Sequence, residues 1–243
     1  MFKKIFKQLI PPIIWNSNRA YRAVKGRQTK YFGCRNEDGT FLDQKLEKYL
    51  NYTEGFFVEL GANNGIDYSN SMYFEKYKNW SGILIEPSPE NYVKCLANRA
   101  ICSKIFCNAC VSFDYKEKFI ELVYANLMST PIGVESDIFD PQQHANQLND
   151  LHQAQPIFGA VATTLTKILE DALAPRVIDL LSLDVEGAEI EVLKGINHEY
   201  YRFHYMVIES RDIDKISQYL QTVNYELVEK LSHHDYLFKN VKL

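Results

Sequence analysis

The stretch that most constrains the fold runs from Phe56 to Gly65 and reads FFVELGANNG. Its apolar residues are typical of a short buried strand in a parallel sheet. The acid at Glu59 and the glycine at Gly61 then end the apolar run, and glycine permits a tight turn and close backbone approach. The sequence therefore predicts a central strand followed by a loop that holds a ligand on exposed backbone N–H groups.

Three further apolar runs end in an acid in the same way, at Glu86, Asp184 and Glu209. Segments with helical spacing lie between these runs. The alternation predicts an open, doubly wound, Rossmann-like α/β fold with a mostly parallel, seven-stranded sheet and an antiparallel last strand. Such sheets bind ligands at the carboxyl ends of strands near the point where the strand order reverses, so we expect these acids around one site.

Spacing and turn residues predict the other elements. We expect helices at residues 41–50, 69–78, 89–99, 165–173, 189–195 and 214–223. We expect strands at residues 56–60, 82–86, 105–111, 118–124, 178–185, 205–210, 226–231 and 236–238. Residues 126–162 show little periodicity to support long regular elements, and we interpret them as an insertion or lid.

The 243-residue chain is long enough for one large domain, which we place at residues 33–243. Before it, residues 1–32 form an arm with eight of the 27 basic residues and none of the 31 acids. Apolar residues at helical spacing among the lysines of residues 1–12 predict a short basic amphipathic helix. Such a helix suits peripheral contact with an anionic membrane, such as an inner membrane face. The alternative is that its apolar stripe packs on the domain. We expect no nucleic-acid partner.

Cysteine usage and hydropathy bear on localisation. The five cysteines are an odd number without framework spacing, which favours reduced thiols in the cytoplasm. Nothing approaches the roughly 20 apolar residues of a membrane span, and Lys7 with the following proline pair interrupts any secretory signal. We therefore expect a cytoplasmic protein.

The position of Glu86 indicates the class of cofactor. It lies 21 residues after Gly65, the spacing at which an acid on the second strand binds the hydroxyls of an adenosine ribose. The first loop lacks G-x-G-x-x-G, because Ala62, Asn63 and Asn64 separate its two glycines. The missing glycine argues against NAD and for a cofactor without a diphosphate.

Together these residues resemble the FkbM-type S-adenosylmethionine-dependent methyltransferases, over about residues 50–125 and 163–240. The most specific match is LDVEGAEIEVLKG at Leu183–Gly195. The other matching blocks are Phe56–Gly65, Ser69–Glu75 with Trp80–Pro87, and Val207–Glu209 with Asp235–Phe238. The resemblance implies a class I methyltransferase fold and S-adenosylmethionine as the cofactor.

The resemblance also implies roles for single residues. Glu59 and the loop Gly61–Gly65 would hold the methionine end of the cofactor, Glu86 the ribose, and Ala109 with Cys110 would border the adenine. The sequence departs from the family after the third strand, where an acid or amide is often found. The full set of expected cofactor-binding residues is Glu59, Gly61, Ala62, Asn63, Asn64, Gly65, Ser69, Glu86, Pro87, Ala109, Cys110 and Asp184.

Methyl transfer to an alcohol needs in-line alignment and a base. Asp184 is the first candidate for the base, and Glu186 and Glu209 are the other acids that we expect near it. Acids at neighbouring strand ends can instead bind a divalent cation, for which Asp184 and Glu209 are the candidate ligands. For Glu189 and Glu191 we prefer a structural role in the first turn of a helix, and for His233 and His234 a solvated loop.

The expected function is O-methyl transfer to a sugar hydroxyl of a glycan or glycoconjugate. The sugar acceptor rests on the family, whose members are commonly associated with surface glycans and with glycosylated or polyketide metabolites. A small-molecule, polyketide-like acceptor is the first alternative. A nicotinamide-dependent oxidoreductase and a non-catalytic binding module on the same fold are the others.

Overall fold

The computed structural model describes residues 29–99, 101–149 and 155–243. The basic amphipathic helix expected in residues 1–12 lies outside the described residues, so it stays a prediction. No helix in the described part of the chain combines the length and the hydropathy needed to cross a membrane.

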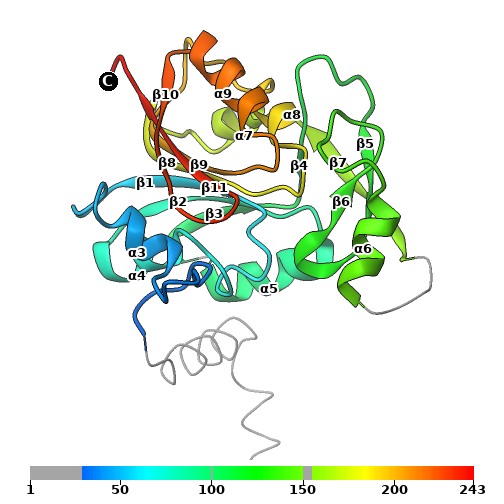
Figure 1. The fold of residues 1–243 in the computed structure, drawn as a ribbon, viewed down its shortest axis with the longest axis horizontal. Coiled ribbons are helices and arrows are strands. Elements are labelled where there is room, and N and C mark those ends of the chain that lie inside the picture. Colours follow the sequence, from blue (N-terminus) through cyan, green and yellow to red (C-terminus); the bar gives the residue numbers. More distant parts are fainter. Residues whose placement is uncertain (1–28, 100, 150–154) are drawn as a thin grey trace, which may run out of the picture.

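The main sheet has seven strands in the order β10-β11-β9-β8-β1-β2-β3 (Figure 1). Only β11 runs antiparallel to its neighbours, which confirms the predicted fold class. Strand order reverses between β1 and β8, which pair in parallel. The strands are β1 Phe56–Leu60, β2 Ser81–Ile85, β3 Ser103–Phe106, β8 Val177–Leu183, β9 Arg202–Glu209, β10 Tyr225–Lys230 and β11 Asp235–Asn240.

Helices cover both faces of this sheet (Figure 1). The helices α7, α8 and α9 lie on one face and α3, α4 and α5 on the other. Their bounds are α3 Leu42–Leu46, α4 Met72–Lys78, α5 Pro89–Arg99, α7 Leu165–Asp171, α8 Glu189–Leu193 and α9 Ile213–Thr222. The helix predicted at residues 41–50 is thus shorter than expected. The helix predicted from Ser69 begins at Met72, because Ser69 and Ser71 instead donate hydrogen bonds to Glu59.

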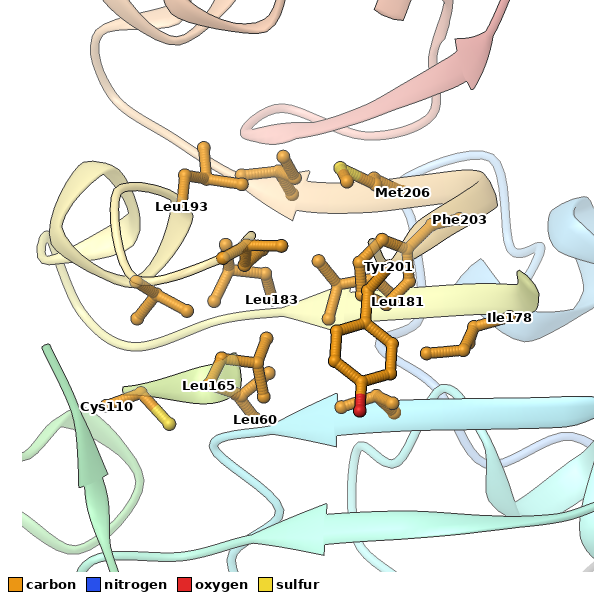
Figure 2. Close-up of a cluster of buried hydrophobic side chains, with 14 of the residues drawn as sticks. Leu60, Cys110, Leu165, Ile178, Leu181, Leu183, Leu193, Tyr201, Phe203 and Met206 are labelled. Carbon is orange, nitrogen blue, oxygen red and sulfur yellow. The ribbon is translucent and has the colours of Figure 1, made fainter. Parts of the chain in front are cut away.

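Side chains alternate between the two faces along β1, as the pleat of a strand requires. Val58 and Leu60 enter the core under α7, α8 and α9, whereas Phe57 enters the core on the other face. Figure 2 shows part of the first core, with Leu181 and Phe203 from adjacent strands in one cluster. Full burial of each such side chain is worth about 1.5–3 kcal/mol. This packing holds the carboxyl ends of the central strands in place.

A second sheet of four strands, in the order β4-β7-β5-β6, lies beside the main one (Figure 1). Its strands are β4 Ala109–Cys110, β5 Phe119–Val123, β6 Thr130–Pro131 and β7 Ile157–Thr163, and the same region contains the 3-10 turn η1 Asn126–Met128 and the helix α6 Pro141–Asn149. The long strand β7 pairs antiparallel with β5 along its length.

Two sequence predictions fail in this region. The strand predicted at residues 105–111 is divided between the sheets, because the chain leaves the main sheet after Phe106 and pairs Ala109 with Ala162. Residues 126–162 contain the regular elements α6 and β7, which the sequence did not predict. The first error arises because apolar content does not reveal which sheet a segment joins. The division at residue 33 and the role of residues 126–162 as a lid stay predictions.

Candidate active site

The loop after β1 is built around glycine. Gly61 has φ of +76°, and a Cβ on it would lie 1.9 Å from the carbonyl oxygen of Asp184. No side chain therefore fits at this position, and the turn after β8 packs directly on the loop. The N–H groups of Gly61 and Ala62 both donate to the carbonyl of Ile85 at 3.1 Å. The three strand ends thus form one rigid edge.

Glu86 lies directly after β2 and is buried at this edge. Its Oε2 accepts a hydrogen bond from the Asn63 N–H at 2.8 Å, and its Oε1 accepts one from the Ser88 N–H at 2.9 Å. Burial raises the pKa of Glu86 to about 7, although both hydrogen bonds oppose the shift. The carboxylate is therefore fixed in direction and has lone pairs left for a ligand.

A cavity with an empty volume of about 660 Å³, including the part open to solvent, lies between the two sheets. Seven of the expected cofactor-binding residues line it, namely Gly61, Asn63, Glu86, Pro87, Ala109, Cys110 and Asp184. Ile120 and Leu122 of β5 add an apolar wall that sequence reasoning missed. The lining thus combines apolar side chains of the second sheet with carboxylates that follow strands of the main sheet.

Glu59, expected to bind the cofactor, does not line this cavity. Alternation along β1 directs its side chain to the face opposite Leu60. There its carboxylate accepts hydrogen bonds from Ser69 Oγ at 2.9 Å, the Asn70 N–H at 2.8 Å and Ser71 Oγ. The network ties the strand to the start of α4, so the contacts of Glu59 are structural.

Four other expected cofactor-binding residues also lie outside the cavity lining. A Cβ on Gly65 would lie 2.9 Å from the sulfur of Cys95, so this glycine lets α5 pack against the loop. The Asn64 side-chain oxygen accepts hydrogen bonds from the N–H groups of Ile66 and Asp67, both at 2.9 Å. Ala62 and Ser69 are buried within the same framework. These residues support the loop after β1 from outside the cavity.

The turn after β8 and the end of β9 bring three acids together. Carboxylate oxygens of Asp184, Glu186 and Glu209 all lie within 4.8 Å of one another. Loss of hydration, followed by the charges of Glu209 and Glu186, raises the pKa of Asp184 well above its usual range. Burial, followed by the charge of Glu209, raises the pKa of Glu186 to about 7. We call these three residues the acid trio; the sequence predicted that they would meet.

Arg211 balances part of this negative charge and was missed by sequence reasoning. Its Nη2 lies 3.2 Å from Glu186 Oε2 and 3.9 Å from Glu209 Oε1. Arg211 lies two positions after Glu209, the acid that ends β9. This proximity is the sequence signal that could have revealed it. Its guanidinium opposes the rise in the pKa of Glu186.

Residues 126–162 also reach the acid trio. The N–H of Asp137 donates to the Gly187 carbonyl at 3.1 Å, and Asp137 Oδ2 accepts from the Arg211 N–H at 3.1 Å. His144 on α6 places its Nε2 3.5 Å from Glu186 Oε2. Nothing in the local sequence signals these contacts, because they join segments about 40 to 75 positions apart.

The other polar residues considered from sequence take structural positions. Glu189 and Glu191 lie in the first turn of α8, as expected. Glu189 Oε1 accepts hydrogen bonds from the N–H groups of Val185 and Gly187, both at 3.1 Å, and so closes the turn that carries the acid trio. His233 and His234 lie in the turn between β10 and β11, and burial lowers the pKa of His234.

The arrangement combines three functions at one edge. A buried carboxylate at Glu86 can bind a pair of hydroxyls, an apolar slot near Cys110 can hold a flat ring, and the acid trio can accept a proton. The trio also offers the oxygen ligands that divalent cations prefer. A divalent cation would compete with the guanidinium of Arg211 for these carboxylates.

Comparisons with known proteins agree with this arrangement. The family model described as the methyltransferase FkbM domain matches residues 59–238. Among curated proteins none matches the chain significantly.

Solved structures give weaker likenesses. A precorrin-6y C5,15-methyltransferase from Geobacter metallireducens GS-15 has 10% identity and a TM-score of 0.45, over 87% of this chain and 98% of that chain. A methyltransferase from Geobacter sulfurreducens has 11% identity and a TM-score of 0.41, over 98% and 93%. A SAM-dependent methyltransferase from Aquifex aeolicus has 10% identity and a TM-score of 0.39, over 94% and 97%.

These TM-scores are too low to carry an argument, so the family match decides the assignment. It spans β1 to β11 and therefore the whole main sheet. The resemblance read from the sequence motifs is confirmed, and the chain belongs to the FkbM methyltransferase family.

Proposed function

We propose that this methyltransferase moves the methyl group of S-adenosylmethionine to a hydroxyl oxygen of a sugar in a glycan or glycoconjugate. The observation that carries O-methyl transfer is the acid trio, two members of which, Asp184 and Glu186, line the cavity. An alcohol is a weak nucleophile that needs a base, and three carboxylates held at 4.8 Å or less supply one near neutral pH. The family assignment favours methyl transfer over the nicotinamide-dependent alternative.

The cavity suggests how the donor binds. The ribose hydroxyls would donate to Glu86, whose orientation two backbone N–H groups fix. The adenine would lie between Pro87 and Cys110, in the apolar part of the lining. The methionine end would then reach Gly61 and the turn at Asp184, which brings the sulfonium toward the acid trio.

The proposed reaction is a single in-line displacement. The acceptor oxygen forms a bond to the methyl carbon while the carbon–sulfur bond breaks, and the hydroxyl proton passes to Asp184. The products are a methyl ether and S-adenosylhomocysteine. Glu209, hydrogen-bonded to Asp184, shares the proton, and Arg211 holds Glu186 in place.

A divalent cation is the alternative to a base. Asp184 and Glu209 would hold it, and the cation would polarise the acceptor hydroxyl. Arg211 already places a positive charge 3.2 Å from Glu186, which weakens the attraction of the trio for a second cation. We therefore propose base catalysis. Loss of activity on treatment with EDTA, with recovery on adding Mg²⁺, would contradict this choice.

The basic arm supplies a further proposal about location. Residues 1–12 would bind the anionic face of the inner membrane from the cytoplasm, where lipid-linked glycans are assembled. Deletion of residues 1–12 should abolish sedimentation with vesicles that contain anionic phosphatidylglycerol and leave cofactor affinity unchanged. Equal sedimentation of the full and shortened chains would overturn this proposal.

Methyl labelling tests the acceptor class. Purified protein is incubated with S-adenosylmethionine carrying a deuterated methyl group and with glycans from the host, and the products are hydrolysed and examined by mass spectrometry. We expect labelled methyl ethers on one kind of sugar. Label recovered only in small lipophilic metabolites would instead support the polyketide-like alternative, and a lack of label in every fraction would support the non-catalytic binding module.

A further inference from the structure

A second cavity opens on the other side of the loop after β1. Its empty volume is about 920 Å³, including the part open to solvent. It lies between three segments that are distant in sequence: the chain before α3, the loop after β1 and the 3-10 turn η1. The lining residues are Thr29, Phe32, Gly33, Arg35, Phe41, Asn63, Asn64, Asp67, Tyr68, Asn126 and Leu127. We call it the acceptor groove.

The acceptor groove adjoins the donor cavity. Asn63, Asn126 and Leu127 line both spaces, so these three residues form the boundary between them. Asn63 donates its backbone N–H to Glu86 from the donor side, and its side-chain oxygen accepts from the Asn64 N–H at 2.6 Å. The groove and the donor cavity are therefore adjacent at these three residues.

Aromatic and hydrogen-bonding side chains alternate along the groove. Tyr68 is 55% exposed and has φ of +62°, a backbone conformation that an aromatic residue rarely adopts. A backbone bridge to Gly33 holds it there. Phe41 adds a second partly exposed ring, and the amides of Asn63 and Asn64 add donors and acceptors. A flat ring beside amides suits a ligand that has both an apolar face and hydroxyl groups.

Arg35 provides the positive charge of the groove. Its side chain is exposed, and its Nε donates to the Gly39 carbonyl at 3.3 Å. Among the described residues it makes no ion pair, so its two Nη groups present the planar fork that binds carboxylate or phosphate oxygens. Asp67, the acid of the lining, accepts a hydrogen bond from Asn64 Nδ2 at 2.8 Å. The open fork of Arg35 thus suits an anionic group at that position in the groove.

We propose that the acceptor groove binds an anionic saccharide, with its carboxylate or phosphate group on Arg35 and a sugar ring against Tyr68. This assignment rests on the proposed function and deepens it, because it names an acidic group on the sugar acceptor beside the hydroxyl that is methylated.

Direct binding measurements test the proposal without relying on turnover. The full chain is saturated with S-adenosylhomocysteine and titrated calorimetrically with tetragalacturonic acid, with galactose 6-phosphate and with neutral maltotetraose. We expect at least one anionic saccharide to bind, and Arg35→Ala to weaken it about tenfold or more because a charge-assisted bidentate pair is lost. Arg35→Lys should recover part of the affinity. Tyr68→Ala should weaken the same saccharide, with thermal unfolding as the check on folding.

The matched control is Arg176→Ala. Arg176 is also exposed but lies at the amino end of β8, with its guanidinium 4.4 Å from the ring centroid of Tyr200. Its removal should leave saccharide affinity unchanged. Binding of tetragalacturonic acid alone assigns a uronic acid, and binding of galactose 6-phosphate alone assigns a phosphorylated sugar.

Three results would overturn the proposal: neither anionic saccharide binds, Arg35→Ala binds as well as the wild type, or Arg35→Ala loses S-adenosylhomocysteine instead. The proposed function fails separately. If anionic saccharides bind through Arg35 and no host glycan takes up labelled methyl, the groove assignment stands and the transfer to glycans does not. If glycans are labelled and Arg35→Ala leaves the KM for them unchanged, only the groove assignment fails.

Discussion

The turns after β1 and β8 lie side by side at one edge of the sheet, but the acids around them have different polar surroundings. Around the first turn, Glu59 and Glu86 each accept two or more hydrogen bonds from N–H or O–H groups. Around the second turn, the carboxylates of the acid trio lie within 4.8 Å of one another. Among the described residues, the guanidinium of Arg211 lies 3.2 Å from Glu186 and 3.9 Å from Glu209.

This difference suits the acids at the first turn to cofactor binding and the acid trio to proton transfer. A carboxylate whose hydrogen bonds are fixed by the backbone keeps one orientation, which suits the recognition of a cofactor. A carboxylate held beside other carboxylates binds a proton more strongly, because like charges at short range disfavour ionisation. The comparison predicts that substitutions at the two turns alter different kinetic quantities.

The largest expected effect is on the rate at the second turn. Asp184→Asn keeps the size of the side chain and removes its ability to take a proton, so kcat for glycan methylation should fall by about 10²–10⁴-fold. Calorimetric affinity for S-adenosylhomocysteine should stay unchanged. In the wild type, kcat should rise with pH above the usual range of an aspartate, because the pKa of Asp184 is raised and the base acts only when it is deprotonated.

Glu199→Gln is the matched control for Asp184→Asn. Glu199 is an exposed acid in the turn before β9, at the amino end of that strand. Its kcat should equal that of the wild type. If Asp184→Asn retains full kcat, the acid trio is structural and the contrast between the two turns disappears.

A smaller effect is expected on donor affinity at the first turn. Glu86→Gln removes the charge that accepts the ribose hydroxyls, and hydrogen bonds to a charged group are worth about 1.5–3 kcal/mol. The calorimetric affinity for S-adenosylhomocysteine should therefore fall roughly 10–100-fold. Exposed Glu90, at the start of α5, provides the control, since Glu90→Gln leaves the cavity untouched. Equal losses in both variants would remove Glu86 from the donor site.

The smallest effect is a pH-dependent change in stability within the second turn. Burial raises the pKa of Glu189 to about 8 in the folded protein, above the usual 4.5 of the unfolded chain. The folded state therefore holds a proton that the unfolded state releases, and the contribution of Glu189 to wild-type stability falls as pH rises from about 4.5 to 8. Glu189→Gln imitates the protonated form and avoids this loss.

Urea unfolding at two pH values checks the Glu189 prediction. At pH 4 the variant and the wild type should be equally stable. At pH 9 the variant should be more stable by about 1–2 kcal/mol, less than the full pKa shift implies, because the site relaxes around the charge. A difference of the same size at both pH values would show that the effect comes from the hydrogen bonds of Glu189 and not from its ionisation.

The two turns also differ in how far the sequence revealed them. The apolar runs that end at Glu86, Asp184 and Glu209 predicted correctly that these acids meet at one sheet edge. Glu59 was expected to hold the methionine end of the cofactor, but its position on the pleat directs its side chain away from the donor cavity. Asp137 and His144 were missed because they reach the turn after β8 from a distant segment, whereas Arg211 lies two positions after Glu209.

Local patterns were enough to predict the main sheet, its central loop and the family, because apolar periodicity, glycine positions and acids at strand ends are local properties of the chain. Which polar groups share a space depends instead on the tertiary structure. It placed Asn63 between two cavities, joined β4 and β7 in a second sheet and brought Arg35 to the groove. Those relations depend on packing between distant segments, and packing is not visible in any local pattern.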